Sequence, residues 1–159
     1  MNTLKKIHNY LYGLSVIKYI LIITVSAYIL ILSIAAVLSN TSLASDTTYS
    51  ISSNILIEYL SGVIISPITE TFLFQMAIII FLRDLVGIKN IAIQIIISAL
   101  AFGILHLPYG IIHAVTAFIM GLILAYSYII YEKKGMHPYW VVVIIHSLSN
   151  LISISLMLL

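Results

Sequence analysis

The chain has 159 residues, of which 62% are hydrophobic and only 8% are charged, with a net charge of +2. Soluble domains carry roughly 25% charged residues, so this composition and the mean hydropathy of +1.20 exclude an ordinary water-soluble domain. The chain has no cysteine, which excludes disulfides and cysteine-ligated metal sites. We therefore expect an integral membrane protein that contacts the lipid bilayer and has no nucleic-acid partner.

Five apolar segments have about the 20 residues that a helix needs to cross the hydrocarbon core of a membrane. In chain order they are approximately Tyr19–Leu38, Tyr59–Leu82, Ile91–Leu107, Ile111–Tyr131 and Trp140–Leu159. They lack the apolar and polar alternation of transmembrane strands. The sequence thus predicts an all-α fold, a polytopic transmembrane helix bundle of about five helices.

The first segment follows two lysines and precedes "SLAS", a pattern that resembles a signal-peptide cleavage site. Its apolar run exceeds the roughly 7–15 residues of a signal core, so we interpret it as a retained membrane helix. The Ser- and Thr-rich stretch Ser39–Asn54 that follows is predicted to be a flexible external loop. We therefore expect an N-terminal unit over residues 1–54 and a four-helix core over residues 55–159.

The basic residues predict the orientation, because Lys and Arg are retained on the cytoplasmic side of membranes. They precede the first segment, separate the second from the third, and separate the fourth from the fifth; they are Lys5, Lys6, Arg83, Lys89, Lys133 and Lys134. This distribution predicts a multi-pass protein of the cell membrane with its N-terminus in the cytoplasm and its C-terminus outside.

Several polar side chains lie inside the predicted membrane segments. Glu70 is about a dozen residues into the second segment, and an ionisable group at that depth is costly and marks a functional site by default. His106 ends the third segment, and His146 and Asn150 share one face of the fifth because they are four residues apart. Together they predict a polar site formed by three helices, although His and Asn also join membrane helices in purely structural roles.

The depth of His106 is less clear from the sequence. At about 1.5 Å per residue, Glu70 and His146 are about 12–18 Å from the inner ends of their helices, whereas His106 is near ~24 Å. Either the third helix begins later, with "GIKNIAIQ" at the interface, or the "LPYG" break dips into the protein. Irregular backbone is tolerated at membrane depth when protein surrounds it, so both explanations stay open.

Three short motifs follow one another on these segments: "ETFLFQ" (70–75), "FGILH" (102–106) and "HSLSN" (146–150). Their order and spacing resemble the CPBP family of intramembrane proteases, which contains CAAX prenyl endopeptidases and bacterial bacteriocin-processing and self-immunity proteins. The signatures of that family are EExxxR, FxxxH and HxxxN, and the resemblance extends from about Ser61 to Ile152. Thr71 and Gln75 replace the second Glu and the Arg. We interpret this paired neutral replacement as an alternative form of the motif, in which the two side chains can hydrogen-bond across one turn.

The resemblance implies an endopeptidase that hydrolyses a bond in a membrane-associated peptide or protein. It assigns to Glu70 the activation of a water molecule, to His106 the holding of that water, and to His146 and Asn150 the stabilisation of an oxyanion. Phe102, Thr71 and Gln75 would support these residues. The short chain and the lack of a soluble domain favour the bacterial branch of the family.

Other functions are compatible with the same residues. Glu70, His106 and His146 match a zinc-hydrolase ligand set in type, but no helix carries a His-Glu-x-x-His arrangement, so we expect no cofactor. A non-catalytic bacteriocin self-immunity or membrane-interaction protein on the same fold stays open as the alternative. A transporter is disfavoured, because the chain shows no repeat symmetry.

Overall fold

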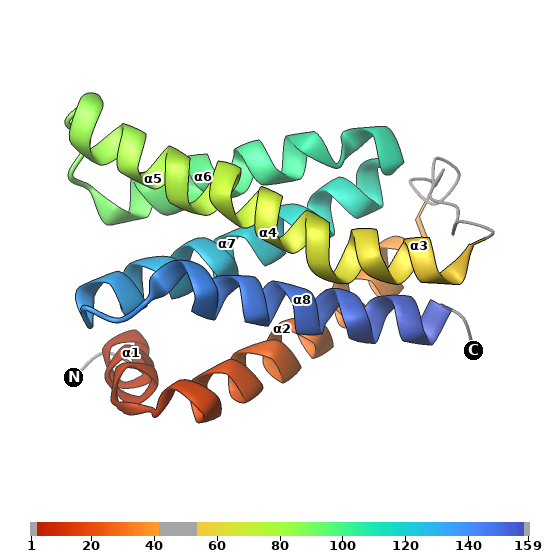
Figure 1. Cartoon of the computed structure of the whole chain (residues 1–159), viewed down its shortest axis with the longest axis horizontal. Helices are drawn as coiled ribbons and strands as arrows, with labels where there is room; N and C mark the ends of the chain where they lie inside the picture. The colour runs from red at the N-terminus through yellow and green to blue at the C-terminus, as the bar shows by residue number, and fades with distance from the viewer. Residues whose placement is uncertain (1–2, 42–53, 158–159) are drawn as a thin grey trace.

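The computed structural model describes residues 3–41 and 54–157, and every regular element within these ranges is helical. The elements are α1 (Thr3–Gly13), α2 (Val16–Leu38), α3 (Ile55–Tyr59), η2 (Leu60–Ile65), α4 (Ser66–Glu70), η3 (Thr71–Ala77), α5 (Ile78–Ile80), η4 (Phe81–Leu85), α6 (Ile91–Leu105), η5 (Leu107–Tyr109), α7 (Ile111–Lys133) and α8 (Pro138–Met157). The predicted all-α transmembrane bundle is confirmed (Figure 1). Residues 42–53 of the predicted external loop lie outside the described residues.

Four helices within the described ranges are long and apolar enough to cross a membrane. They are α2, α7, α8 and the continuous helix Ile55–Leu85, which contains α3, η2, α4, η3, α5 and η4 and is called the interrupted helix below. The ends of the bundle carry Asn caps: Asn54 accepts from Leu56 N and Ile57 N, and Asn90 accepts from Ala92 N and Ile93 N. Such caps satisfy amide groups that have no partner within the helix.

The helix α6 is shorter than predicted, because it ends at Leu105 after 15 residues. Its length of about 22 Å falls short of the roughly 30 Å hydrocarbon core. Pro108 explains the early end, since it has no N–H and its ring crowds the carbonyl four residues earlier. The helix begins at Ile91 as predicted, so the "LPYG" break, and not a later start, accounts for the depth of His106.

The chain reverses at Gly110, whose φ of 107° favours glycine, and α7 then packs closely along α6. A Cβ on Gly103 would lie 2.9 Å from the Cβ of Phe118, and a Cβ on Gly121 would lie 2.9 Å from the Cα of Ala99. Small residues let membrane helices approach to backbone contact. The α6–α7 pair is therefore held together by close packing.

The helix α2 packs against α7 and α8, and a buried tyrosine forms the centre of this contact. The hydroxyl of Tyr19 donates to Ser127 Oγ at 3.0 Å, and its ring meets Tyr131 edge-on at 4.9 Å. Lys134 Nζ lies 4.6 Å from the ring centroid of Tyr131 and donates to the carbonyl of Leu14 at 3.2 Å. These contacts join the N-terminal helices to the core; the domain boundary at residue 54 stays a prediction.

The helix α1 was not predicted from the sequence. It crosses the end of the bundle, since Figure 1 looks nearly along its axis while the long helices run across the view. His8 ties α1 to α7 through a 2.8 Å hydrogen bond between its Nδ1 and the hydroxyl of Tyr126. Lys5 and Lys6 are exposed on α1, so basic residues of the N-terminus and of the α7–α8 turn lie at the same end of the bundle.

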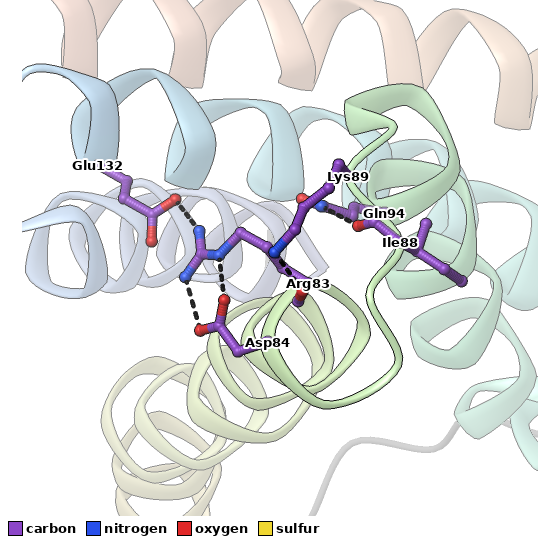
Figure 2. Close-up of polar contacts among 6 residues, drawn as sticks. All are labelled: Arg83, Asp84, Ile88, Lys89, Gln94 and Glu132. Atoms are coloured by element: carbon purple, nitrogen blue, oxygen red, sulfur yellow. Dashed lines mark hydrogen bonds and ion pairs between the residues drawn. The ribbon is translucent and has the colours of Figure 1, made fainter.

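A cluster of charged residues joins the interrupted helix to α7 at this end (Figure 2). Arg83 donates from Nη1 to Glu132 Oε2 at 2.6 Å, and from Nε and Nη2 to the two carboxylate oxygens of Asp84 at 3.0 and 3.3 Å. Lys89 Nζ donates to the carbonyl of Arg83 at 2.8 Å. The cluster fixes the turn between η4 and α6.

Large apolar side chains cover much of the outer surface of the long helices. Leu85 is 78% exposed, Ile17 71% and Val37 68%. Exposed apolar surface on this scale marks contact with a membrane or another apolar partner. The outer surface of the bundle is therefore suited to lipid contact, as its long apolar helices predict.

Candidate active site

The interrupted helix alternates between α-helical and π-helical turns, and this changes its backbone hydrogen bonding near Glu70. In a π turn each N–H bonds to the carbonyl five residues earlier, and such turns are frequent at functional sites. The N–H of Ser66 bonds to Ser61 O, and Pro67 has no N–H. The carbonyl of Gly62 thus lacks both its α-helical donor, residue 66, and its π-helical donor, residue 67.

Side chains of α8 bond to two carbonyls of this helix. Asn150 Nδ2 donates to Gly62 O at 2.8 Å, and the hydroxyl of Tyr139 donates to Ile68 O at 2.9 Å. An unpaired carbonyl in a membrane protein costs several kcal/mol, so Asn150 stabilises the backbone that Pro67 leaves unpaired. Asn150 was predicted to donate to an oxyanion, and one of its two amide hydrogens is therefore already bonded to the carbonyl of Gly62.

Glu70 ends α4 and faces His146 of α8. Glu70 Oε2 and His146 Nε2 lie 3.7 Å apart, and the two side chains are 19% and 4% exposed. This distance exceeds that of a hydrogen bond, but catalytic hydrogen bonds in ligand-free sites are often long and shorten in the complex. His146 Nδ1 is buried and has no hydrogen-bond partner among the described residues.

His106 lies beyond the last turn of α6, and a backbone hydrogen bond fixes its tautomer. Its Nδ1 lies 2.8 Å from the carbonyl of Phe102. Because a carbonyl only accepts, Nδ1 carries the hydrogen, and in the neutral ring Nε2 has a free lone pair. The ring of Phe102 lies 4.6 Å from that of His106 and 5.6 Å from that of His146. Phe102 therefore packs against both imidazoles.

Three further residues around this aromatic group were not among the site residues predicted from the sequence: Phe74, Ser98 and His113. Phe74 meets Phe102 edge-on at 5.8 Å, and the carbonyl of Phe74 accepts a 2.7 Å hydrogen bond from Ser98 Oγ. His113 of α7 stacks on His106 at 5.3 Å. The signal in the sequence for the contact between His106 and His113 was the "LPYG" turn between them, because a tight turn brings the residues on its two sides together.

The predicted hydrogen bond between Thr71 and Gln75 is wrong. Both side chains are fully buried, at 0% exposure, yet Thr71 Oγ1 and both polar atoms of Gln75 have no partner among the described residues. The prediction assumed a regular α-helical turn, whereas Thr71–Ala77 is a π-helix, whose backbone hydrogen bonds join residues five apart and not four apart. The replacement of an ion pair by two neutral groups therefore leaves an unpaired amide in the bundle.

No three His, Asp or Glu side chains in residues 3–41 and 54–157 are grouped so that they could hold a metal ion. Glu70 contacts His146, and the ring of Phe102 lies next to the rings of both His146 and His106. A cavity of about 450 Å³ opens beside the interrupted helix and the start of α8. It is lined by Phe72, Met76, Tyr128, His137, Pro138, Tyr139 and Trp140.

The fold and the site define a polytopic membrane protein that holds a half-buried glutamate, Glu70, beside a buried histidine, His146, and a half-buried one, His106. The family model described as type II CAAX prenyl endopeptidase Rce1-like matches residues 52–152. This match covers more than half of the chain, and the chain belongs to that family, with the fold of an intramembrane CAAX-type protease. The resemblance predicted from the three motifs is thereby confirmed. No curated protein and no solved structure matches the chain.

Proposed function

We propose that the protein is a bacterial intramembrane endopeptidase in which Glu70 activates a water molecule to hydrolyse a peptide bond. The substrate is a peptide, or the membrane-proximal segment of another protein, that reaches the site from the bilayer. The observation that carries this proposal is the 3.7 Å contact between Glu70 Oε2 and His146 Nε2 inside a bundle of a protease family. A carboxylate in such a protected site is a plausible general base.

The reaction needs no nucleophilic side chain. The carboxylate of Glu70 takes a proton from the water as the water oxygen attacks the carbonyl carbon. His106 accepts the second hydrogen bond of this water through Nε2, which its bond to the Phe102 carbonyl leaves without a hydrogen. Glu70 then passes the proton to the amide nitrogen as the C–N bond breaks, so that a carboxylate and an amine leave the site.

His146 and Asn150 stabilise the negative charge that develops on the substrate oxygen. Nε2 of His146 lies on the side of Glu70, and Asn150 keeps a second amide hydrogen besides the one that Gly62 accepts. Removing one fixed donor of this kind costs roughly 2.7–4 kcal/mol in transition-state stabilisation. The bond to Gly62 holds the Asn150 amide in place, which favours its use as a preorganised donor.

The test compares the wild type with Glu70→Gln in detergent on a quenched membrane-peptide library, with and without a chelator. Glu58→Gln is the matched control, because it removes a carboxylate from the same helix near its outer end. We expect cleavage by the wild type and by Glu58→Gln, a loss of at least about a thousandfold in Glu70→Gln, and no effect of the chelator.

Two results would contradict the proposal. Cleavage by Glu70→Gln at the wild-type rate would exclude a glutamate base. Cleavage that the chelator abolishes would move Glu70, His106 and His146 into a metal site. If Glu70→Gln preserves the biological activity of the protein in cells, the non-catalytic immunity or interaction function is supported instead.

A further inference from the structure

We propose that Tyr139, which lies outside the three motifs, is a positioning residue that holds Glu70 against His146. The inference rests on the proposed function for its effect on activity, but not for its effect on geometry. Its hydroxyl donates to Ile68 O at 2.9 Å, and Ile68 precedes Glu70 by two residues within α4. Among the described residues, two side chains of α8 donate hydrogen bonds to backbone carbonyls of the interrupted helix, and the bond of Tyr139 is the one nearer to Glu70.

The bond belongs to a regular series along the interrupted helix. The carbonyls of Gly62, Ile68 and Phe74, six residues apart, accept hydrogen bonds from Asn150, Tyr139 and Ser98, at 2.8, 2.9 and 2.7 Å. Carbonyls along a regular helix bond to the helix itself. The neighbouring helices α8 and α6 therefore fix the rotation of the interrupted helix at three points, and the middle point is beside Glu70.

Tyr139 is itself well placed to act as a fixed point. It follows Pro138 at the start of α8, and its ring meets that of Trp140 edge-on at 5.0 Å. Without this hydroxyl, the nearest such bonds are those of Asn150 and Ser98, whose acceptor carbonyls, Gly62 and Phe74, are each six residues from Ile68 and lie outside α4. A small rotation of α4 then moves the Glu70 carboxylate out of line with His146.

The first test uses Tyr139→Phe, which keeps the ring and removes only the hydroxyl. Its matched control is Tyr59→Phe, because the Tyr59 hydroxyl also joins the interrupted helix to α8, through Ser155 Oγ at 3.1 Å, but far from Glu70. We expect kcat to fall about tenfold or more in Tyr139→Phe with KM within about twofold, since a misplacement of 1 Å can cost 10²-fold. Tyr59→Phe keeps the wild-type kcat, and both variants show a similar small decrease in Tm.

The second test reads the geometry without activity. The chain has no cysteine, so a Glu70→Cys, His146→Cys pair can be joined by a short bifunctional thiol reagent. We expect Tyr139→Phe to slow this cross-linking several-fold and Tyr59→Phe to leave it unchanged.

The results separate the two proposals. Equal kcat and equal cross-linking rates in Tyr139→Phe and Tyr59→Phe overturn the positioning role of Tyr139, whatever the chemistry of the site. If Tyr139→Phe slows the cross-linking and Tyr59→Phe does not, the positioning role is supported. If Glu70→Gln nevertheless stays active, the proposed function is overturned while the positioning role stands.

Discussion

The two helix pairs of the core are held together in opposite ways. The α6–α7 pair brings backbones into contact through glycine and alanine, as at Gly121, whose added Cβ would meet the Cα of Ala99. The interrupted helix and α8 are joined by polar side chains that reach across to carbonyls, as Asn150 does to Gly62 and Tyr139 to Ile68. One pair depends on shape and the other on hydrogen bonds.

The difference shows where a membrane protein can place a reactive group. The cavity of about 180 Å³ beside the tightly packed α6–α7 pair is lined by apolar side chains and a glycine, whereas a helix with π turns and a proline presents carbonyls and polar side chains to its neighbours. Glu70 lies on the second kind of helix, and Phe72 and Met76 of the same helix line a cavity of about 450 Å³. The α6–α7 pair supplies a rigid frame against which His106 and Phe102 are held.

The largest effect on stability is expected from a methyl group added to the tight pair. Gly121→Ala places a Cβ 2.9 Å from backbone, so we expect a loss of about 1–3 kcal/mol. Gly62→Ala is the matched variant: its Cβ would meet only the side chain of Ile154, at 2.7 Å from Cδ1 and 3.9 Å from Cγ1, and helix propensity favours Ala by up to ~1 kcal/mol. Unfolding titrations in detergent measure both, and equal losses would contradict a difference between the two pairs.

The second prediction concerns two buried glutamines. Gln75 has no hydrogen-bond partner among the described residues, whereas Gln94 Nε2 donates to Ile88 O at 2.6 Å (Figure 2). Because an unsatisfied buried polar group costs about 1–3 kcal/mol, we expect Gln75→Met to raise the free energy of unfolding and Gln94→Met to lower it. A loss of stability in Gln75→Met would show that its amide is hydrogen-bonded after all.

The third prediction tests why Asn150 bonds to the backbone. We expect Asn150→Leu to cost about 1–2 kcal/mol, because the carbonyl of Gly62 is left without a donor. In a Pro67→Ala background, residue 67 regains an N–H, and the cost should shrink by at least about 0.5 kcal/mol. A double-mutant cycle in detergent measures this coupling, and strictly additive effects would show that Pro67 is not the cause.

The smallest effect is expected where a surface ion pair joins the two helix pairs. Glu132→Gln removes the 2.6 Å partner of Arg83, which keeps its two bonds to Asp84 (Figure 2). Since both side chains are about one third exposed, we expect a loss of only about 0.2–1 kcal/mol, decreasing at high salt. A larger, salt-independent loss would mean that the pair is held away from solvent.

The sequence by itself determined the class and the order of the helices. Twelve charged residues in 159 cannot cover a soluble surface, and apolar runs must be helices because lipid offers backbone groups no partner. The pairs Phe102–His106 and His146–Asn150 could be predicted to share a helix face, because side chains four residues apart on a regular α-helix do so. Glu70 could be identified because a carboxylate is rare inside a membrane segment. The end of α6 was missed by two residues, although Pro108 was the signal for it.

Only the tertiary structure decided how the polar residues are used. Thr71 and Gln75 do not bond to each other, and they lie in a π-helix that local spacing did not predict. The bond from Asn150 to Gly62 joins residues 88 positions apart, and that from Tyr139 to Ile68 joins residues 71 apart. Local spacing predicts which side chains share a helix face. It does not predict which carbonyl a side chain of a neighbouring helix will reach, because that depends on how all the helices of the bundle pack together.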